Sequence, residues 1–284
     1  MFYDFIEIGT SDFDTLIEQA DDQTVGLSVE PIAAYLDRLP RPKLCTKLNA
    51  AISNQDGEVV VFYLSPEKIF EYGLPAGFKG CNSIGKPHPT VASFLALTTL
   101  DQKVIFDTIN IPAYRLRSVL ALHNVSGMYF LKVDTEGHDV TILNDFFSDA
   151  PRAVWPHEIL FESNILSDND SLQLLIAKLI TIGYDIKSCN TVGDGDTSLR
   201  LNIRRAQGGV TFSNEIEGYY LMGYPDGYDP SLAAHDNTLI GAKEYCVNTK
   251  SGGVTYQYGR YEVRKGQYLE KSRDDRNVIS WIYF

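Results

Sequence analysis

The stretch that decides the fold is Phe5-Ile6-Glu7-Ile8-Gly9-Thr10-Ser11-Asp12, near the start of a 284-residue chain. Its apolar half ends on an acid and a glycine, and apolar residues then recur at helical spacing. This pattern predicts a strand, a tight turn and a helix from about Asp14 to Ala20. Such a turn points free helix N–H groups, hydroxyls and a carboxylate at one spot. Gly9 allows a sharp turn and lets a ligand lie against the backbone. A nucleoside-bearing cofactor suits this turn, and an ordinary strand-to-helix connection is the alternative.

Composition and charge limit the classes of function. The hydrophobic fraction of 44% is ample for one core, and the length suits one large domain or one domain with an appendage. A net charge of −12 repels polyphosphate, so we expect no nucleic acid partner. No apolar run approaches the ~20 residues of a membrane span, and no signal peptide precedes the first strand, so we expect a cytoplasmic protein. The four cysteines lack metal-ligand spacing, and we assign no metal ligands.

The next two strands carry the features that a nucleoside needs. A strand from Thr24 to Glu30 ends on an acid, and Pro31 then opens a short helix. Rossmann-type folds hold ribose hydroxyls with an acid at this place, whereas a solvated charge at a strand end is the bland alternative. A third strand, residues 43–53, has Asn49 and two alanines near its end, and such small side chains leave room for a flat ring.

A segment rich in glycine and proline follows, from Ser65 to Thr90. A loop of this length in a compact domain is usually functional or mobile. We interpret residues 80–88 as a lid or substrate collar, with a disordered surface insertion as the alternative. A strand over residues 104–106 and a helix over residues 114–122 are expected after it.

The second informative stretch is Met128-Tyr129-Phe130-Leu131-Lys132-Val133-Asp134-Thr135-Glu136-Gly137-His138-Asp139. Its apolar run predicts a central parallel strand that is buried on both faces. Ligands of open α/β sheets bind at the carboxyl ends of strands. The three acids and the histidine there would act as a base, orient a hydroxyl or bind a metal ion, whereas helix capping explains only one of them. The next strand, His157 to Glu162, also closes on an acid.

The chain changes character after Arg204. A helix over residues 171–182 and strands over residues 184–187 and 198–203 complete the expected sheet. The remainder holds ten of the 17 tyrosines, and residues 254–263 alternate like a hairpin. We therefore predict two domains, residues 1–204 and a β-rich extension over residues 205–284. The extension suits sugar recognition, a small β-core or a homodimer interface.

Four motifs now stand in one order. They are Glu7-Ile8-Gly9-Thr10, Val29-Glu30-Pro31, Asn49-Ala50-Ala51-Ile52 and Leu131-Lys132-Val133-Asp134-Thr135-Glu136-Gly137. Together they resemble the FkbM family of S-adenosylmethionine-dependent methyltransferases, over about Phe2 to Arg204. The last motif matches the family's K-[IV]-D-x-E-G signature, which is fairly specific. The first departs from the family's Asp-x-Gly-Ala-x-x-Gly pattern, because Glu7 replaces the aspartate and Phe13 stands near the second glycine.

The resemblance implies an α/β fold, a Rossmann-like class I methyltransferase sheet with helices on both faces, followed by a small tyrosine-rich C-terminal β segment. It implies S-adenosylmethionine as cofactor and O-methylation of a hydroxyl on a sugar, a glycan or a glycosylated small molecule. The implied cofactor-binding residues are Glu7, Gly9, Thr10, Ser11, Asp12, Glu30, Pro31, Asn49, Ala50, Ala51 and Asp134.

The chemistry of the residues adds candidates for catalysis and acceptor binding. An alcohol is a poor nucleophile at neutral pH, so a base beside it is needed. The catalytic candidates are His138, Asp134 and Glu136; His138 is favoured because an unperturbed histidine titrates near neutrality. The substrate-binding candidates are Ser83, His88, His157 and Glu162, and the last two are also second choices for the base.

Two other classes of function stay open. One is a nicotinamide-dependent oxidoreductase on a similar sheet, and the missing GxGxxG motif counts against it. The other is a non-catalytic glycan-binding module that uses the tyrosine-rich segment, and the acids at the strand ends count against it.

Overall fold

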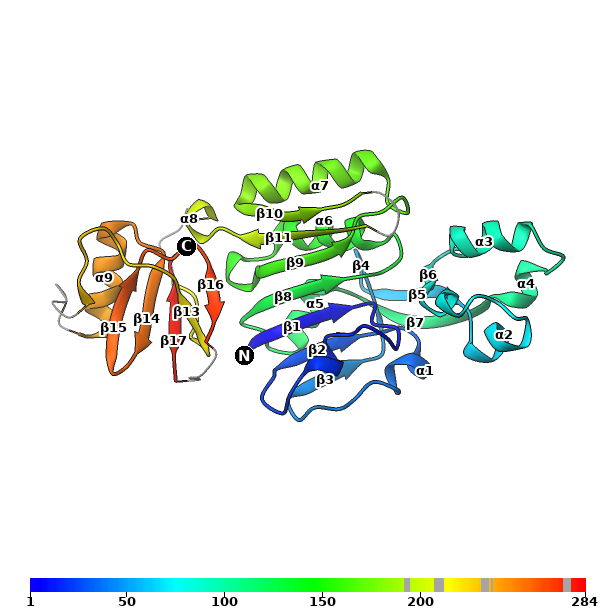
Figure 1. Cartoon of the computed structure of the whole chain (residues 1–284), viewed down its shortest axis with the longest axis horizontal. Helices are drawn as coiled ribbons and strands as arrows, with labels where there is room; N and C mark the ends of the chain where they lie inside the picture. Colours follow the sequence, from blue (N-terminus) through cyan, green and yellow to red (C-terminus); the bar gives the residue numbers. More distant parts are fainter. Residues whose placement is uncertain (192–194, 207–211, 231–234, 236, 273–276) are drawn as a thin grey trace.

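A seven-stranded sheet forms the centre of the protein (Figure 1). The structure, a computed structural model, describes residues 1–191, 195–206, 212–230, 235, 237–272 and 277–284. The strands, in sheet order, are β10 (Tyr184–Cys189), β11 (Asp196–Leu201), β9 (Pro156–Glu162), β8 (Gly127–Val133), β1 (Phe2–Ile8), β2 (Gly26–Val29) and β3 (Cys45–Leu48). Neighbouring strands from β9 to β3 are parallel. β11 runs antiparallel to both of its neighbours, β9 and β10. The predicted α/β fold with a large, mostly parallel sheet is confirmed.

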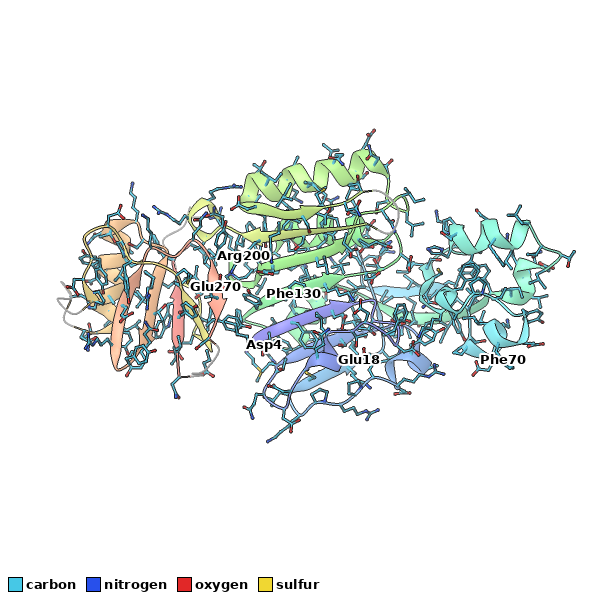
Figure 2. The ribbon with its side chains drawn as sticks, viewed as in Figure 1. Asp4, Glu18, Phe70, Phe130, Arg200 and Glu270 are labelled. Atoms are coloured by element: carbon cyan, nitrogen blue, oxygen red, sulfur yellow. The ribbon has the colours of Figure 1, made fainter. Side chains whose placement is uncertain are left out.

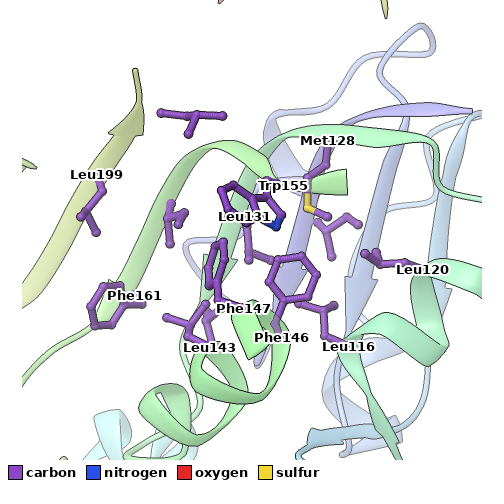
Figure 3. Close-up of a cluster of buried hydrophobic side chains, with 14 of the residues drawn as sticks. Leu116, Leu120, Met128, Leu131, Leu143, Phe146, Phe147, Trp155, Phe161 and Leu199 are labelled. Carbon is purple, nitrogen blue, oxygen red and sulfur yellow. The ribbon is translucent and has the colours of Figure 1, made fainter. Parts of the chain in front are cut away.

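Three helices cover one face of this sheet: α5 (Leu116–Leu122), α6 (Asp139–Asp149) and α7 (Asn169–Ile182). Leu131 points from β8 into the layer between sheet and helices, where Phe146 and Phe147 of α6 pack (Figure 3). Side chains of a strand alternate between faces, so the neighbouring positions of β8 point away from this layer.

On the opposite face, two short elements pack against the sheet, η1 (Ile17–Gln19) and α1 (Ala33–Leu36). They bury Phe5 and leave Phe130 partly buried, whereas the face carries the charged Lys132 and Glu158 beyond them. Helices on both faces were expected, and on this face they are reduced to these two short elements. The predicted helix over residues 14–20 is wrong, because its only helical turn is η1. Glu7 binds the N–H of Leu16, which fixes this part of the loop to the sheet.

A second sheet has the strand order β4 (Ala51–Ser53), β7 (Asp107–Arg115), β5 (Gly57–Tyr63) and β6 (Ser83–Ile84). The single strand predicted over residues 43–53 is therefore divided between two sheets, as β3 and β4. The helix expected over residues 114–122 begins at Leu116, because Tyr114 and Arg115 still pair with β4.

Residues 64–106 form a folded unit, which we call the inserted lobe (cyan in Figure 1). Its helices are α2 (Pro66–Glu71), η2 (Ala76–Gly80), α3 (Pro89–Ala96) and α4 (Gln102–Ile105). Leu64, Val91, Leu95 and Ile105 give the lobe its own buried cluster. The disordered insertion is thus excluded, and the strand expected over residues 104–106 is wrong because α4 occupies most of it.

The C-terminal segment, residues 203–284, combines strands with helices. Its elements are α8 (Ile203–Ala206), β12 (Ile216–Glu217), β13 (Tyr219–Leu221), α9 (Leu239–Thr249), β14 (Gly253–Gln257), β15 (Arg260–Arg264), β16 (Leu269–Lys271) and β17 (Ile279–Ile282). The sheet order is β12-β17-β14-β15, and β13 pairs with β16. The predicted hairpin is confirmed as β14–β15, and α9 was not expected.

The C-terminal segment packs against the amino ends of the central parallel strands. The Tyr219 hydroxyl donates to Asp4 Oδ1 at 2.7 Å, and its ring contacts the rings of Phe2 and Tyr129. Arg200 of β11 meets Glu270 of β16 at 2.6 Å (Figure 2). Apolar residues of the segment share one buried cluster with the central sheet; they include Ile216, Tyr219, Leu221, Leu269, Ile282 and Phe284. The segment therefore completes the core from the end opposite the Gly9 turn. In the described part of the chain, no helix has the length and apolarity to cross a membrane.

Candidate active site

A cavity opens at the carboxyl ends of β1, β2 and β8. Its volume is about 110 Å³, many times the ~10–15 Å³ that one water molecule needs. β1 lies between β2 and β8 in the sheet. The chain continues from β1 to β2 and β3 on one side and later adds β8 and β9 on the other, and ligands bind where strand order reverses in this way. The inserted lobe supplies one wall through Gly80, Asn82, Ser83 and Ile84.

The turn after β1 is held by its neighbours. Gly9 has a φ of +80°, and a Cβ placed on it would lie 1.8 Å from the backbone oxygen of Asp134. The close approach that requires glycine is therefore to the next strand, β8. Gly9 also lines the cavity, so a ligand lying against its backbone stays a prediction.

Ser11 follows in the same turn, with a φ of +47°. Ser11 lines the cavity, and its buried side-chain oxygen has no hydrogen-bond partner among the described residues. A buried hydroxyl without a partner is costly, and a ligand in the cavity would satisfy it.

Glu7 lies beneath the turn and does not line the cavity. Its carboxylate is fully buried and accepts from the N–H of Leu16 at 3.0 Å and from Lys132 Nζ at 3.2 Å. Burial raises the pKa of Glu7, and the Lys132 charge opposes that rise. The side chain fixes the loop over residues 9–16, and its position outside the cavity wall does not support the predicted contact with the cofactor.

Glu30 lines the cavity at the end of β2. Its Oε2 accepts from the N–H of Ser11 and its Oε1 from that of Ile32, both at 2.8 Å. Burial raises its pKa to about 7, and these backbone bonds oppose the rise. Each oxygen keeps a second lone pair, so this fork can also accept from a ligand.

The other residues predicted to bind cofactor divide into two groups. The structure places Thr10, Pro31, Ala50, Ala51 and Asp134 in the cavity wall. Asn49 instead donates to the backbone oxygens of Glu30 and Pro31, both at 2.9 Å. Asp12 forms ion pairs with Arg38 and Lys79. Asn49 and Asp12 therefore support the wall from outside.

Carboxyl groups gather beside the turn that follows β8. Asp134 and Glu136 line the cavity, and Glu162 at the end of β9 joins them, with one oxygen of each within 4.8 Å of the others. Burial, then the charges of Glu136 and Asp139, raises the pKa of Glu162 to about 9. For Asp134, partial burial raises the pKa to about 6, with Lys132 opposing and Glu136 adding to the rise. Such a group can accept hydrogen bonds from hydroxyls or take up a proton.

A family model described as the Methyltransferase FkbM domain matches residues 7–164. The chain belongs to the FkbM methyltransferase family. Every residue that lines the cavity falls within the matched range, and the C-terminal segment falls outside it. No curated protein and no solved structure matches the chain.

Asp139 holds the FkbM signature turn, residues 134–138, against β9. No separate role was predicted for this aspartate. Asp139 is fully buried; its Oδ2 accepts from Thr135 Oγ1 at 2.8 Å, and its Oδ1 accepts from the N–H of Glu162 at 3.3 Å. Gly137, with a φ of +94°, faces Leu166, which already fills the space beside it. A side chain at this position would therefore crowd Leu166.

His138 does not line the cavity. It precedes α6, its Nε2 lies 3.0 Å from Ser53 Oγ, and burial lowers its pKa. The choice of His138 as base is not supported by this position, and Asp134 and Glu136 are better placed.

The four candidates for substrate binding also separate. Ser83 lines the cavity, and Glu162 belongs to its carboxyl group cluster. His88 lies behind the wall, where its Nε2 is 2.9 Å from Glu136 Oε2. His157 lies far from the cavity, at the amino end of β9, beside Phe2 and Tyr129. Five residues of strand, roughly 17 Å, separate it from Glu162.

Sequence reasoning missed Lys132 in this FkbM site. Lys132 lines the cavity, and its ammonium group pairs with Glu7 and donates to the backbone oxygen of Asp14 at 3.0 Å. The signal was present, since the signature contains a lysine two residues before Asp134. A lysine that interrupts an otherwise apolar strand needs a buried partner, and Glu7 is in register with it on β1.

Proposed function

We propose that this chain is an S-adenosylmethionine-dependent O-methyltransferase that acts on a hydroxyl of a sugar, a glycan or a glycosylated small molecule. One observation carries the proposal: a single cavity is lined by the Gly9 turn, by Glu30 and by the carboxyl-bearing residues Asp134 and Glu136. The order β3-β2-β1-β8-β9 is the doubly wound arrangement, and it supports a class I methyltransferase fold.

The residues of the cavity fit S-adenosylmethionine. Glu30 offers free lone pairs to ribose hydroxyls, and the small Ala50 and Ala51 leave room for the adenine ring. The unpartnered hydroxyl of Ser11 lies in the same wall and suits the polar methionine moiety. When bound, this cofactor supplies a methyl group that its sulfonium centre has already activated.

The chain itself then has to orient the acceptor and remove its proton. Asp134 is the group best placed to take that proton, because it lines the cavity and its side chain is 44% exposed. Glu136 and Glu162 lie beside it and would accept hydrogen bonds from neighbouring hydroxyls. An acceptor with several hydroxyls, such as a sugar, matches a wall built from carboxyl groups.

The alternative functions find less support. A nicotinamide cofactor would need the glycine-rich turn that is missing after β1. The tyrosine-rich C-terminal segment packs at the amino ends of the strands, whereas the cavity opens at their carboxyl ends. We therefore propose that this segment completes the core and that the acceptor reaches the cavity from the side of the inserted lobe.

Calorimetric titration of the purified protein tests the cofactor. S-adenosylmethionine should bind once per chain, and NAD should not bind. The Glu30→Gln variant should bind S-adenosylmethionine about ten- to a hundred-fold more weakly, because it loses roughly 1.5–3 kcal/mol of charge-assisted hydrogen bonding.

Glu71→Gln is the matched control, since Glu71 is exposed on α2 of the inserted lobe. Unchanged affinity in a folded Glu30→Gln variant would remove the assignment of this cavity to the cofactor. Binding of NAD in place of S-adenosylmethionine would favour the oxidoreductase. Mass spectrometry of glycans from cells with and without the gene then identifies the acceptor.

A further inference from the structure

A thiol, an imidazole and a carboxylate meet where the inserted lobe touches the signature turn. Cys81, His88 and Glu136 each place one ligand atom within 4.8 Å of the other two. Cys81 follows η2, His88 precedes α3, and Glu136 belongs to the turn between β8 and α6. The three residues therefore come from two separate parts of the fold, and no sequence spacing announces them.

We propose that Cys81, His88 and Glu136 form a binding site for a zinc ion. Zinc takes thiolate, imidazole and carboxylate ligands at roughly 2.0–2.3 Å in tetrahedral geometry, which holds ligand atoms roughly 3.3–3.7 Å apart. The present separations are close to this range: His88 Nε2 is 2.9 Å from Glu136 Oε2, somewhat short of it, and all three ligand atoms lie within 4.8 Å of one another. Small side-chain rotations would close the site.

The mixture of donors selects the metal. A thiolate and an imidazole are soft or borderline ligands, which favour zinc over magnesium or calcium. The neighbouring group of Asp134, Glu136 and Glu162 contains only carboxyl groups and is not part of this proposal.

Burial and location give the site its character. His88 is 2% exposed, and Glu136 and Cys81 are half-buried. Glu136 lines the cavity, as do Gly80 and Asn82 on either side of Cys81. Three protein ligands leave a fourth position of the tetrahedron open, as in zinc sites that bind water or substrate. The ion would join the inserted lobe to the signature turn at the cavity wall.

Metal binding can be measured without any methyl acceptor. The full chain, stripped with a chelator and shown by circular dichroism to stay folded, is titrated with zinc chloride in a calorimeter. We expect one ion per chain, with an affinity that falls at lower pH because the thiol must lose its proton. Cobalt(II) added to the same protein should give the near-ultraviolet absorption of a cobalt–thiolate bond.

Two variants and one control decide the assignment. Cys81→Ser should abolish the cobalt–thiolate absorption, and both Cys81→Ser and His88→Gln should weaken zinc binding about tenfold or more. Cys189→Ser is the control, because Cys189 is an exposed cysteine on β10 and its loss should change neither readout. The proposal fails if the folded wild type binds no zinc, or if Cys81→Ser and His88→Gln bind it as tightly as the wild type. The cobalt spectrum of the wild type tests the thiolate ligand even if a variant does not fold.

Discussion

The backbone oxygen of Asp134 occupies the space that any side chain at Gly9 would need, since a Cβ there would lie 1.8 Å away. The turn that ends β1 and the turn that ends β8 are therefore packed backbone against backbone. This contact sets two walls of the cavity side by side, with Ser11 on one turn and Glu136 on the other.

Replacement of Gly9 by alanine should strongly destabilise the protein. The new methyl group would overlap the Asp134 carbonyl, and the φ of +80° adds about 1–2 kcal/mol of strain for a residue with a Cβ. Denaturant unfolding measures the loss. Gly77→Ala is the control, because Gly77 has no neighbour within 4 Å of a new Cβ and should change stability by less than about 0.5 kcal/mol. Equal stability of the two variants would contradict the packed geometry.

Asp134→Asn and His138→Ala should differ in turnover in a methyl-transfer assay with the identified acceptor. Loss of a general base slows turnover by about 10²–10⁴-fold, and we expect this for Asp134→Asn with cofactor affinity nearly unchanged. His138 contacts Ser53 and does not line the cavity, so His138→Ala should keep most of its turnover. A large loss in His138→Ala beside normal turnover in Asp134→Asn would return the base to the histidine.

His157 should make the protein sensitive to acid. Burial lowers its pKa to about 3, and the Arg200 charge adds to the effect. In the unfolded chain the pKa of this histidine is about 6.5. Below that pH the unfolded chain binds a proton that the folded chain excludes, so the free energy of unfolding falls by up to about 1.4 kcal/mol per pH unit. Between pH 7.5 and pH 5 the free energy of unfolding, measured with urea, should fall by about 2 kcal/mol less in His157→Gln than in the wild type. The same slope in variant and wild type would refute the buried neutral state.

Tyr219→Phe should lower stability and leave cofactor affinity unchanged. The variant loses the hydroxyl that donates to Asp4 Oδ1 at 2.7 Å, a bond to a charged group that contributes about 1.5–3 kcal/mol. Tyr258→Phe, at a site 86% exposed on the hairpin turn, should be nearly neutral. A loss of cofactor affinity in Tyr219→Phe, with no loss of stability, would place the C-terminal segment in the binding site.

The parallel strands were predictable because burial on both faces leaves a continuous apolar run. Glu30 and Asp134 followed from the same rule, since they come directly after such runs and the carboxyl ends of parallel strands share one edge. The same rule excludes His157, which begins its strand. The helices of the inserted lobe were missed because they are short and start at Pro66 and Pro89. Proline suits the first helical position, but a run of prolines and glycines is equally typical of a loop.

The roles of Glu7 and His138 depended on contacts between distant parts of the chain. Glu7 stands beside Gly9 in sequence, yet its carboxylate points to Lys132 of the neighbouring strand and to the loop below. His138 follows the signature acids but turns toward Ser53, which the sequence places 85 residues earlier. Strand periodicity gives the face of a side chain and not its partner, so these assignments needed the tertiary structure.

The packing of the C-terminal segment on the amino ends of the strands has a consequence for synthesis on the ribosome. All residues that line the cavity have been synthesised once the ribosome has added residue 136. Asp4 and Tyr219, in contrast, are separated by 215 positions. A nascent chain can therefore assemble the cavity while Phe2 and Tyr129 still lack the rings that cover them. Until the last strands emerge, an apolar patch at the far end of the sheet stays open to water, to chaperones or to another nascent copy.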